Sequence, residues 1–204
     1  MSEPDFIHRF VPAASGDARV VLLLHGTGGN ESDLLPLASE LVPGAAVLSP
    51  RGKVSENGMP RFFRRFAEGV FDEEDIILRA NELADFVTAA AQRYSFDASN
   101  VMALGYSNGA NIAAAMMLLR PEVLKSALLL RAMVTLSHPP AAQLSGKRVL
   151  LSAGESDPII PLANVQRLAA VLKNAVADVT LDIQQASHGL VQADLASARR
   201  WLSA

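Results

Sequence analysis

Short apolar runs alternate with longer amphipathic stretches along the chain. Runs rich in Val, Leu, Ile and Ala predict buried strands at 19–24, 45–49, 100–104, 126–130, 148–152 and 179–183. Stretches with apolar residues three or four positions apart predict helices at 33–41, 71–93, 110–119, 162–173 and 190–202. Strands that alternate with helices imply right-handed βαβ crossovers. We therefore predict a three-layer α/β fold with a mostly parallel central sheet and helices on both faces.

Local signals refine this pattern. Ser32 can cap the helix predicted from residue 33, and acidic residues at 72–75 suit the first turn of the helix at 71–93. The stretch 50–69 carries turn residues and the motif Pro60-Arg-Phe-Phe-Arg-Arg65, which predicts a loop. Neither a linker nor a repeat interrupts the 204 residues, a usual size for one domain. We expect a single domain over residues 1–204, with no cap domain.

The composition narrows the function. Lys and Arg number 18 against 21 Asp and Glu, a net charge of −3 with no basic stripe, so nucleic acid is not an expected partner. The absence of cysteine excludes disulfides, a Cys nucleophile and thiolate metal sites, and favours the cytoplasm by default. The N-terminus has no signal-peptide pattern, and apolar runs fall far short of the roughly 20 residues of a membrane span. We expect a cytoplasmic protein without a membrane span.

The segment Gly105-Tyr-Ser107-Asn-Gly109 matches the pattern G-x-S-x-G. A serine between glycines is often only a turn. Here a predicted strand precedes the segment and a predicted helix follows it, which is the setting of a nucleophile in a sharp strand-to-helix turn. The glycines relieve crowding in such a turn, so we predict Ser107 as a nucleophile.

A serine nucleophile needs a base within hydrogen-bond reach, usually histidine. His188 follows the last predicted strand, where the base is expected. His25 begins a glycine-rich loop and suits a structural role, whereas His8 and His138 lie outside the loops expected to build a site. We predict that His188 is the base.

Asp157 lies in a tight turn after the strand at 148–152 and is the best candidate to orient the base. The alternative is a helix cap or Asx turn, common for Asp before Pro. Asp178 and Asp182 are poorer candidates because they fall before or within a strand. The order Ser107, Asp157, His188 is that of α/β-hydrolases.

His25-Gly-Thr27-Gly-Gly29 follows the first strong strand. Acyl transfer passes through an oxyanion that needs preorganised N–H donors, and we predict the backbone N–H groups of Thr27 and Asn108 as these donors. A phosphate-binding loop is the weaker interpretation, because the segment lacks G-x-G-x-x-G and no Walker lysine follows. We expect no cofactor.

Four segments together resemble the phospholipase/carboxylesterase family of α/β-hydrolases over nearly the whole chain: Leu-Leu-Leu-His25-Gly-Thr-Gly-Gly-Asn, Gly-Tyr-Ser107-Asn-Gly-Ala-Asn, Gly-Glu-Ser-Asp157-Pro-Ile-Ile-Pro and Ser-His188-Gly-Leu. That family is similar to the acyl-protein thioesterases and includes small, lidless, metal-independent carboxylesterases. The segment 60–65 resembles its bacterial carboxylesterase branch. The resemblance implies the same triad and oxyanion donors, no metal, and a homodimer. Asn108 stands where the thioesterases usually carry Gln.

Other residues near the predicted site have two interpretations. Phe62, Phe63 and Phe66 could line an acyl pocket, although aromatic residues over a sheet more often serve packing. Arg131 ends an apolar strand at the edge where the site is expected. It could bind an anionic group or, as we favour, fix a loop through a buried ion pair.

The leading hypothesis is a serine carboxylesterase that hydrolyses small or short-chain esters through an acyl-enzyme on Ser107. A thioesterase or lysophospholipase would use the same triad. A non-catalytic α/β-hydrolase that binds a ligand is the alternative from another class, but such proteins commonly lose a triad member, and here none is missing.

Overall fold

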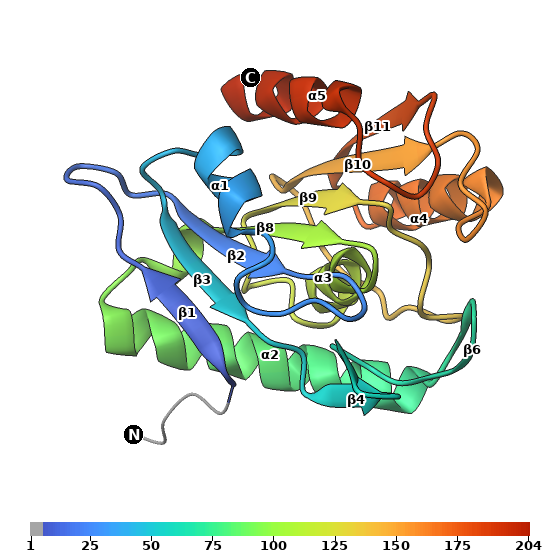
Figure 1. Cartoon of the computed structure of the whole chain (residues 1–204), viewed down its shortest axis with the longest axis horizontal. Coiled ribbons are helices and arrows are strands. Elements are labelled where there is room, and N and C mark those ends of the chain that lie inside the picture. The colour runs from blue at the N-terminus through green and yellow to red at the C-terminus, as the bar shows by residue number, and fades with distance from the viewer. Residues whose placement is uncertain (1–5) are drawn as a thin grey trace.

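A seven-stranded sheet runs through the middle of the computed structural model, which describes residues 6–204 (Figure 1). β1 pairs antiparallel with β3, and the other neighbouring strands are parallel. This arrangement confirms the predicted mostly parallel α/β architecture. In spatial order the strands are β1 (His8–Val11), β3 (Ala46–Pro50), β2 (Val20–Leu24), β8 (Val101–Tyr106), β9 (Ser126–Leu130), β10 (Arg148–Gly154) and β11 (Asp178–Gln184).

Helices cover both faces of the sheet (Figure 1). Side chains of β2 alternate between two cores, since Val20, Leu22 and Leu24 belong to one cluster and Val21 and Leu23 to the other. The first cluster is shared with α2 (Glu73–Tyr94), α3 (Asn108–Leu119) and α4 (Leu162–Asn174), the second with α1 (Leu35–Leu41) and α5 (Gln192–Ser203). Because the sheet is buried on both faces, side chains that point to either side are apolar, and the strands appear in the sequence as continuous apolar runs.

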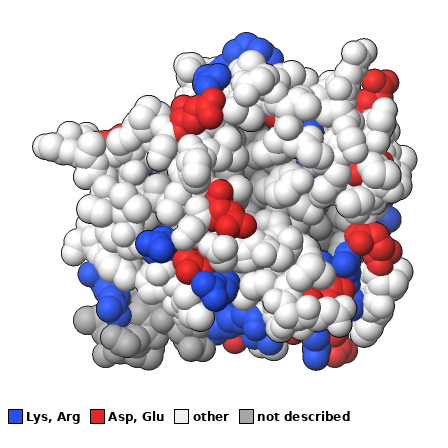
Figure 2. All heavy atoms as spheres, in the orientation of Figure 1, with Lys and Arg blue, Asp and Glu red and all other residues white. Residues whose placement is uncertain are grey.

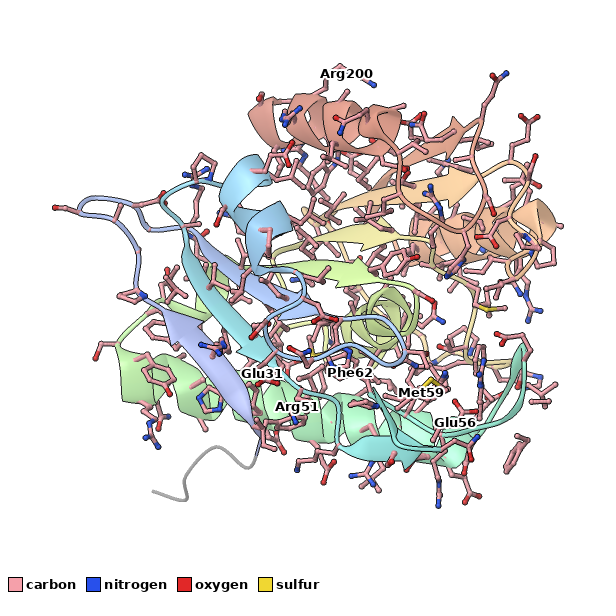
Figure 3. All side chains as sticks on the ribbon, in the orientation of Figure 1. Glu31, Arg51, Glu56, Met59, Phe62 and Arg200 are labelled. Carbon is pink, nitrogen blue, oxygen red and sulfur yellow. The ribbon has the colours of Figure 1, made fainter. Side chains whose placement is uncertain are left out.

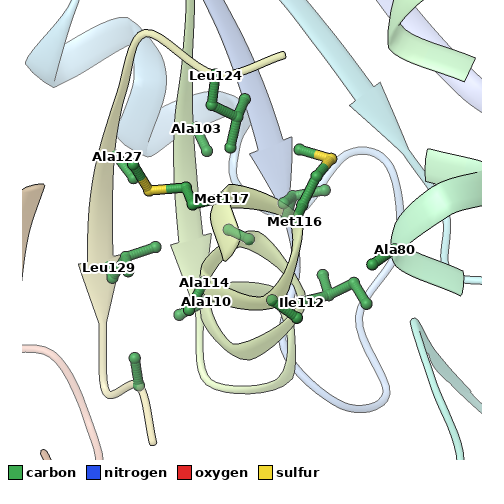
Figure 4. Packing of buried hydrophobic residues seen from close by; sticks show 14 of the residues in the cluster. Ala80, Ala103, Ala110, Ile112, Ala114, Met116, Met117, Leu124, Ala127 and Leu129 are labelled. Atoms are coloured by element: carbon green, nitrogen blue, oxygen red, sulfur yellow. The ribbon is translucent and has the colours of Figure 1, made fainter. Parts of the chain in front are cut away.

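The helix α3 lies inside the larger cluster, between the sheet and α2 (Figure 4). Its residues 108–118 are all buried, so it carries no polar stripe. Met116, Met117 and Ile112 fill the space between small alanine side chains (Figure 4). This close packing fixes the start of α3 relative to the sheet. Within residues 6–204, no helix is long and apolar enough to cross a membrane.

The structure differs from the predicted elements in three places. The stretch 50–69 was predicted as a loop, but it contributes to two small hairpins, β4 (Val54–Glu56) with β5 (Met59–Arg61) and β6 (Arg65–Ala67) with β7 (Val70–Phe71). The edge strand β1 was not predicted, because its burial is only partial. Ser32 does not cap α1; the helix begins after Leu34, and the Ser32 hydroxyl accepts a hydrogen bond from Arg9.

Parallel strands bring the loops after β2, β8, β10 and β11 to the same edge of the sheet. The short 3₁₀ helix η1 (Ala98–Asn100) lies at the opposite ends of the strands, directly before β8. The four predicted site segments therefore meet at one edge, although they are separated widely in the sequence.

Candidate active site

The turn between β8 and α3 holds Ser107 in a conformation that non-glycine residues rarely adopt, with φ 51° and ψ −115°. Its backbone N–H donates to the Leu130 carbonyl at 2.8 Å, which fixes the turn to β9. At Gly109, a Cβ atom would overlap the carbonyl group of Leu24 at the end of β2. At Gly105, it would lie 2.7 Å from backbone atoms of α3. The glycine spacing therefore follows from backbone contacts on both sides of the serine.

The His188 imidazole bridges the serine and the aspartate. Its Nε2 lies 3.1 Å from Ser107 Oγ, and its Nδ1 lies 2.8 Å from Asp157 Oδ2. The other oxygen of Asp157 accepts backbone hydrogen bonds from Ile159 and Ile160 at 2.8 and 3.1 Å. The carboxylate is buried, whereas the imidazole keeps 19% of its side-chain surface exposed. The three predicted residues are brought together in the order that proton transfer from the serine requires.

The histidine loop is held through three consecutive carbonyl groups. The guanidinium of Arg131 donates through Nε to the Ser187 carbonyl at 3.1 Å and through Nη2 to the Gly189 carbonyl at 2.8 Å. The Tyr106 hydroxyl donates to the carbonyl of His188 itself at 3.1 Å. Burial raises the pKa of Tyr106, which keeps this hydroxyl protonated. The backbone that carries His188 therefore has little freedom to move.

Arg131 is fully buried and forms a bidentate ion pair with Asp194 at the start of α5, with both N–O distances 2.8 Å. Burial by itself raises the pKa of Asp194, but hydrogen bonds from Arg131 and Ser152 outweigh it and hold that pKa below its usual range. The pocket role predicted for Arg131 is therefore contradicted, because no surface of the side chain reaches solvent. Its contacts match the alternative of a buried ion pair that fixes a loop.

The predicted oxyanion donors lie at two of the loops that meet the serine. Within residues 6–204, neither the Thr27 N–H nor the Asn108 N–H donates to another protein group. Asn108 is the first residue of α3, where free N–H groups and the helix dipole favour negative charge. These two groups therefore remain available to a ligand.

The aromatic residues predicted as pocket candidates do not line an open pocket. Phe62 and Phe63 are 2% and 0% exposed and belong to the larger core cluster (Figure 3). This burial contradicts the pocket prediction for both residues, since their side chains leave almost no surface open to a ligand. Phe66, by contrast, is 75% exposed on the β6–β7 hairpin. Phe62 and Phe63 lie in the bend between β5 and β6, whereas Phe66 lies on β6, and no motif in the sequence indicated this difference.

Met59 was not among the residues predicted to lie near the site. This side chain lies on β5, 41% exposed, and its atoms would be 3.7 Å from a Cβ at Gly28, directly after Thr27 (Figure 3). Ile159 is also partly exposed, two residues after Asp157. Both apolar side chains border the loops that carry the predicted site.

The remaining histidines have other partners. His25 Nδ1 donates to the Gly26 carbonyl at 2.7 Å, and its Nε2 accepts from the Gly52 N–H at 3.0 Å, so the imidazole is neutral. His8 contacts the Tyr94 hydroxyl, and His138 lies exposed beside Ser137. Within the described residues, no three His, Asp or Glu side chains form a group that could hold a metal ion.

Charged side chains of both signs are interspersed on the face shown in Figure 2, where most gather along the lower edge. On the hairpins and α2, charged side chains pair locally, as Arg65 does with Glu56 at 2.9 Å and Arg79 with Glu82 at 2.7 Å. This face presents no field of one sign that would attract a polyanion.

Comparisons with known proteins agree over nearly the whole chain. The family model described as phospholipase/carboxylesterase matches residues 8–204. MhqD of Bacillus subtilis (strain 168), which is named as a hydrolase, is 44% identical over 182 residues, 89% of this chain and 91% of that protein. A carboxylesterase from Bacillus cereus is 48% identical with a TM-score of 0.93, covering 96% and 92% of the two chains. A carboxylesterase from Mesorhizobium loti is 34% identical with a TM-score of 0.88, covering 92% and 89%.

The Arg131–Asp194 pair gives a prediction about stability. Replacing Arg131 with Met leaves the Asp194 carboxylate buried without its cation, and we expect the free energy of unfolding to fall by about 3–5 kcal/mol. The double variant Arg131→Met with Asp194→Leu removes both charges and is expected to recover part of this loss. Urea unfolding at neutral pH measures both values. An Arg131→Met protein as stable as the wild type would contradict this account.

His25 gives a prediction about pH. Burial lowers its pKa below the 6.5 of a solvated imidazole, and the hydrogen bond to the Gly26 carbonyl only partly opposes this. The folded chain then binds fewer protons than the unfolded chain, so His25 stabilises the fold above pH 6.5 and this stability is lost as the pH falls toward the folded pKa.

We expect the His25→Gln variant to lose less stability than the wild type between neutral and mildly acidic pH. Gln can still accept from Gly52 but does not titrate in this range. Urea unfolding of both proteins above and below pH 6.5 isolates the His25 contribution, since the other histidines are common to both. If the free energy of unfolding changed equally with pH in the two proteins, this prediction would be wrong.

Proposed function

The chain belongs to the phospholipase/carboxylesterase family and is a serine hydrolase, and we propose that it is a carboxylesterase. Its substrates in this proposal are small or short-chain esters, which it hydrolyses through an acyl-enzyme on Ser107. The observation that carries the proposal is the His188 imidazole, 3.1 Å from Ser107 Oγ and 2.8 Å from Asp157 Oδ2. This geometry supplies a base for the hydroxyl and an acceptor that fixes the tautomer of the base.

In the first step, Ser107 Oγ attacks the ester carbonyl carbon while its proton passes to His188 Nε2. Asp157 accepts from Nδ1–H and stabilises the imidazolium, and two backbone N–H groups keep that carboxylate in place. When the tetrahedral intermediate collapses, the carbon–oxygen bond to the alcohol breaks, and the alcohol leaves with the proton from Nε2. The acyl group remains bonded to Ser107.

In the second step, water attacks the acyl-enzyme, and His188 accepts a proton from that water. The intermediate collapses to release the carboxylic acid, and the proton returns to Ser107. In both steps the carbonyl oxygen becomes an oxyanion that the backbone N–H groups of Thr27 and Asn108 stabilise. Loss of one such donor typically lowers the rate about a hundred- to a thousandfold.

A preference for small acyl groups is supported by the residues around the loops. Phe62 and Phe63 are buried in the core, so they offer no surface to a long acyl chain. Met59 and Ile159 are exposed singly beside Gly28 and Asp157 and give an apolar contact of limited area. A short acyl group needs no more apolar area than this.

The first test is removal of the nucleophile. Ser107→Ala leaves His188 without a hydroxyl to activate, so ester hydrolysis should fall by at least about a thousandfold. Labelling by a fluorophosphonate probe should be lost as well. Ser39→Ala, on the exposed face of α1, is the matched serine control and should behave as wild type. A wild-type protein that the probe does not label would favour a ligand-binding protein without catalysis.

The second test is the acyl-chain preference. Across a series of p-nitrophenyl esters from acetate to long-chain acids, kcat/KM should be highest for the short chains and fall with length. The same acyl groups offered as thioesters and lysophospholipids separate the activities that one triad can support. An optimum at long chains, or faster cleavage of thioesters than of matched oxygen esters, would overturn the proposed substrate class.

A further inference from the structure

The motif at 60–65 lies against both residues that carry the proposed oxyanion donors. The Pro60 carbonyl accepts from the Gly28 N–H at 2.9 Å, within the glycine-rich loop. Arg61 Nη1 donates to Thr27 Oγ1 at 2.6 Å. One residue later, the Phe62 N–H donates to Asn108 Oδ1 at 2.7 Å. Three consecutive residues thus contact the two loops that face the nucleophile.

We propose that this support segment, Pro60–Phe62, positions the oxyanion hole, and that Arg61 is its charged anchor. The proposal rests on the proposed function, because it assigns the segment to the Thr27 and Asn108 donors. Arg61 touches neither substrate nor the reacting atoms, since its guanidinium is directed at the Thr27 side chain. It is a positioning residue that fixes where the Thr27 N–H points.

The environment of Arg61 suits this role. The side chain is 3% exposed, although Arg61 is the last residue of β5 in the small β4–β5 hairpin. Besides Thr27, it donates through Nε to the Phe63 carbonyl at 3.2 Å and pairs with Glu56 at 3.3 Å. Its guanidinium also lies over the Phe63 ring, 5.6 Å from the centroid. A planar group with several donors satisfies these partners together, which a single ammonium group could not do.

Asn108 provides the second anchor. Its side chain is 2% exposed, and the bond from the Phe62 N–H fixes its Oδ1. The Nδ2 of the same amide is buried without a hydrogen-bond partner among the described residues. A buried, unpaired donor is costly. This cost is explained if the Asn108 Oδ1 is needed to accept the hydrogen bond from the Phe62 N–H.

The support segment is itself rigid. At Gly52, a Cβ atom would overlap the Arg61 carbonyl, so the chain before the hairpin packs directly on the segment. The Gly52 N–H donates to His25, whose ring lies 4.7 Å from that of Phe62. His25 begins the same loop that carries Thr27. The loop and the segment are therefore linked at more than one point.

The test is a double-mutant cycle with Arg61→Met and Thr27→Val, which leaves every backbone N–H in place. Displacement of a donor by about 1 Å can cost on the order of a hundredfold in rate. We expect Arg61→Met to lower kcat roughly 10- to 100-fold with little change in KM, because the oxyanion forms only after substrate binds. Affinity for a trifluoromethyl ketone, which mimics the tetrahedral intermediate, should fall by a similar factor.

Thr27→Val should lower kcat in the same direction, and the double variant should lose less than the product of the two single losses, since both remove one hydrogen bond. The dependence of kcat on pH should stay that of the wild type, because the His188–Asp157 pair is untouched. Arg64→Met is the matched control, since Arg64 follows the same segment but is exposed and pairs with Asp72 at 3.0 Å. Its kcat should equal that of the wild type.

Three outcomes would overturn the proposal. The first is a Thr27→Val variant with the kcat of the wild type. The second is a double variant whose loss of kcat equals the product of the two single losses, and the third is a set of variants in which only KM changes. If Arg61→Met does not fold, the variants Arg61→Lys and Thr27→Val still test the hydrogen bond between Arg61 and Thr27. Wild-type affinity of both variants for the trifluoromethyl ketone would then contradict the proposal. An active Ser107→Ala enzyme would instead refute the proposed function, so the two failures are distinguishable.

Discussion

The close contact between the first turn of α3 and the end of β2 is the constraint on which the rest of the site depends. No side chain fits at Gly109, because a Cβ there would overlap the Leu24 carbonyl. The contact holds the strained Ser107 backbone against the loop that begins at His25. The proposed nucleophile and the proposed oxyanion loop therefore share one rigid junction, formed by backbone atoms and fixed by the buried helix α3 (Figure 4).

Two buried arginines extend this rigidity to the loops around the junction. Arg131 binds the carbonyl groups on either side of His188 and pairs with Asp194, while Arg61 contacts Thr27 from the end of β5. A guanidinium can bind several loop oxygens at once with fixed geometry, which suits positions where the chain has no regular structure. On this account, charge buried away from the reacting atoms keeps the base and the oxyanion donors in place before substrate arrives.

The fold and the proximity of Ser107, Asp157 and His188 could be predicted because both depend on local signals. Parallel strands bring their carboxyl ends to one edge, so Ser107, Asp157 and His188 could be placed from the strands that precede them. The supporting contacts could not be predicted, because they join distant segments: Arg131 meets Asp194 63 residues later. Within 54–71, Phe62 is buried between the two short hairpins and Phe66 is exposed on one of them; no clear apolar pattern marks this difference, so the sequence alone suggested a loop.

Catalysis through an ester bond to Ser107 can be observed directly by mass spectrometry of the enzyme quenched during turnover of a p-nitrophenyl ester. If Ser107 forms the acyl-enzyme, the intact protein should be heavier by one acyl group, and peptide mapping should locate that group on the segment containing Ser107. The adduct should disappear once the ester is consumed. Turnover without any adduct in rapidly quenched samples, or an acyl group mapped to another residue, would contradict the account.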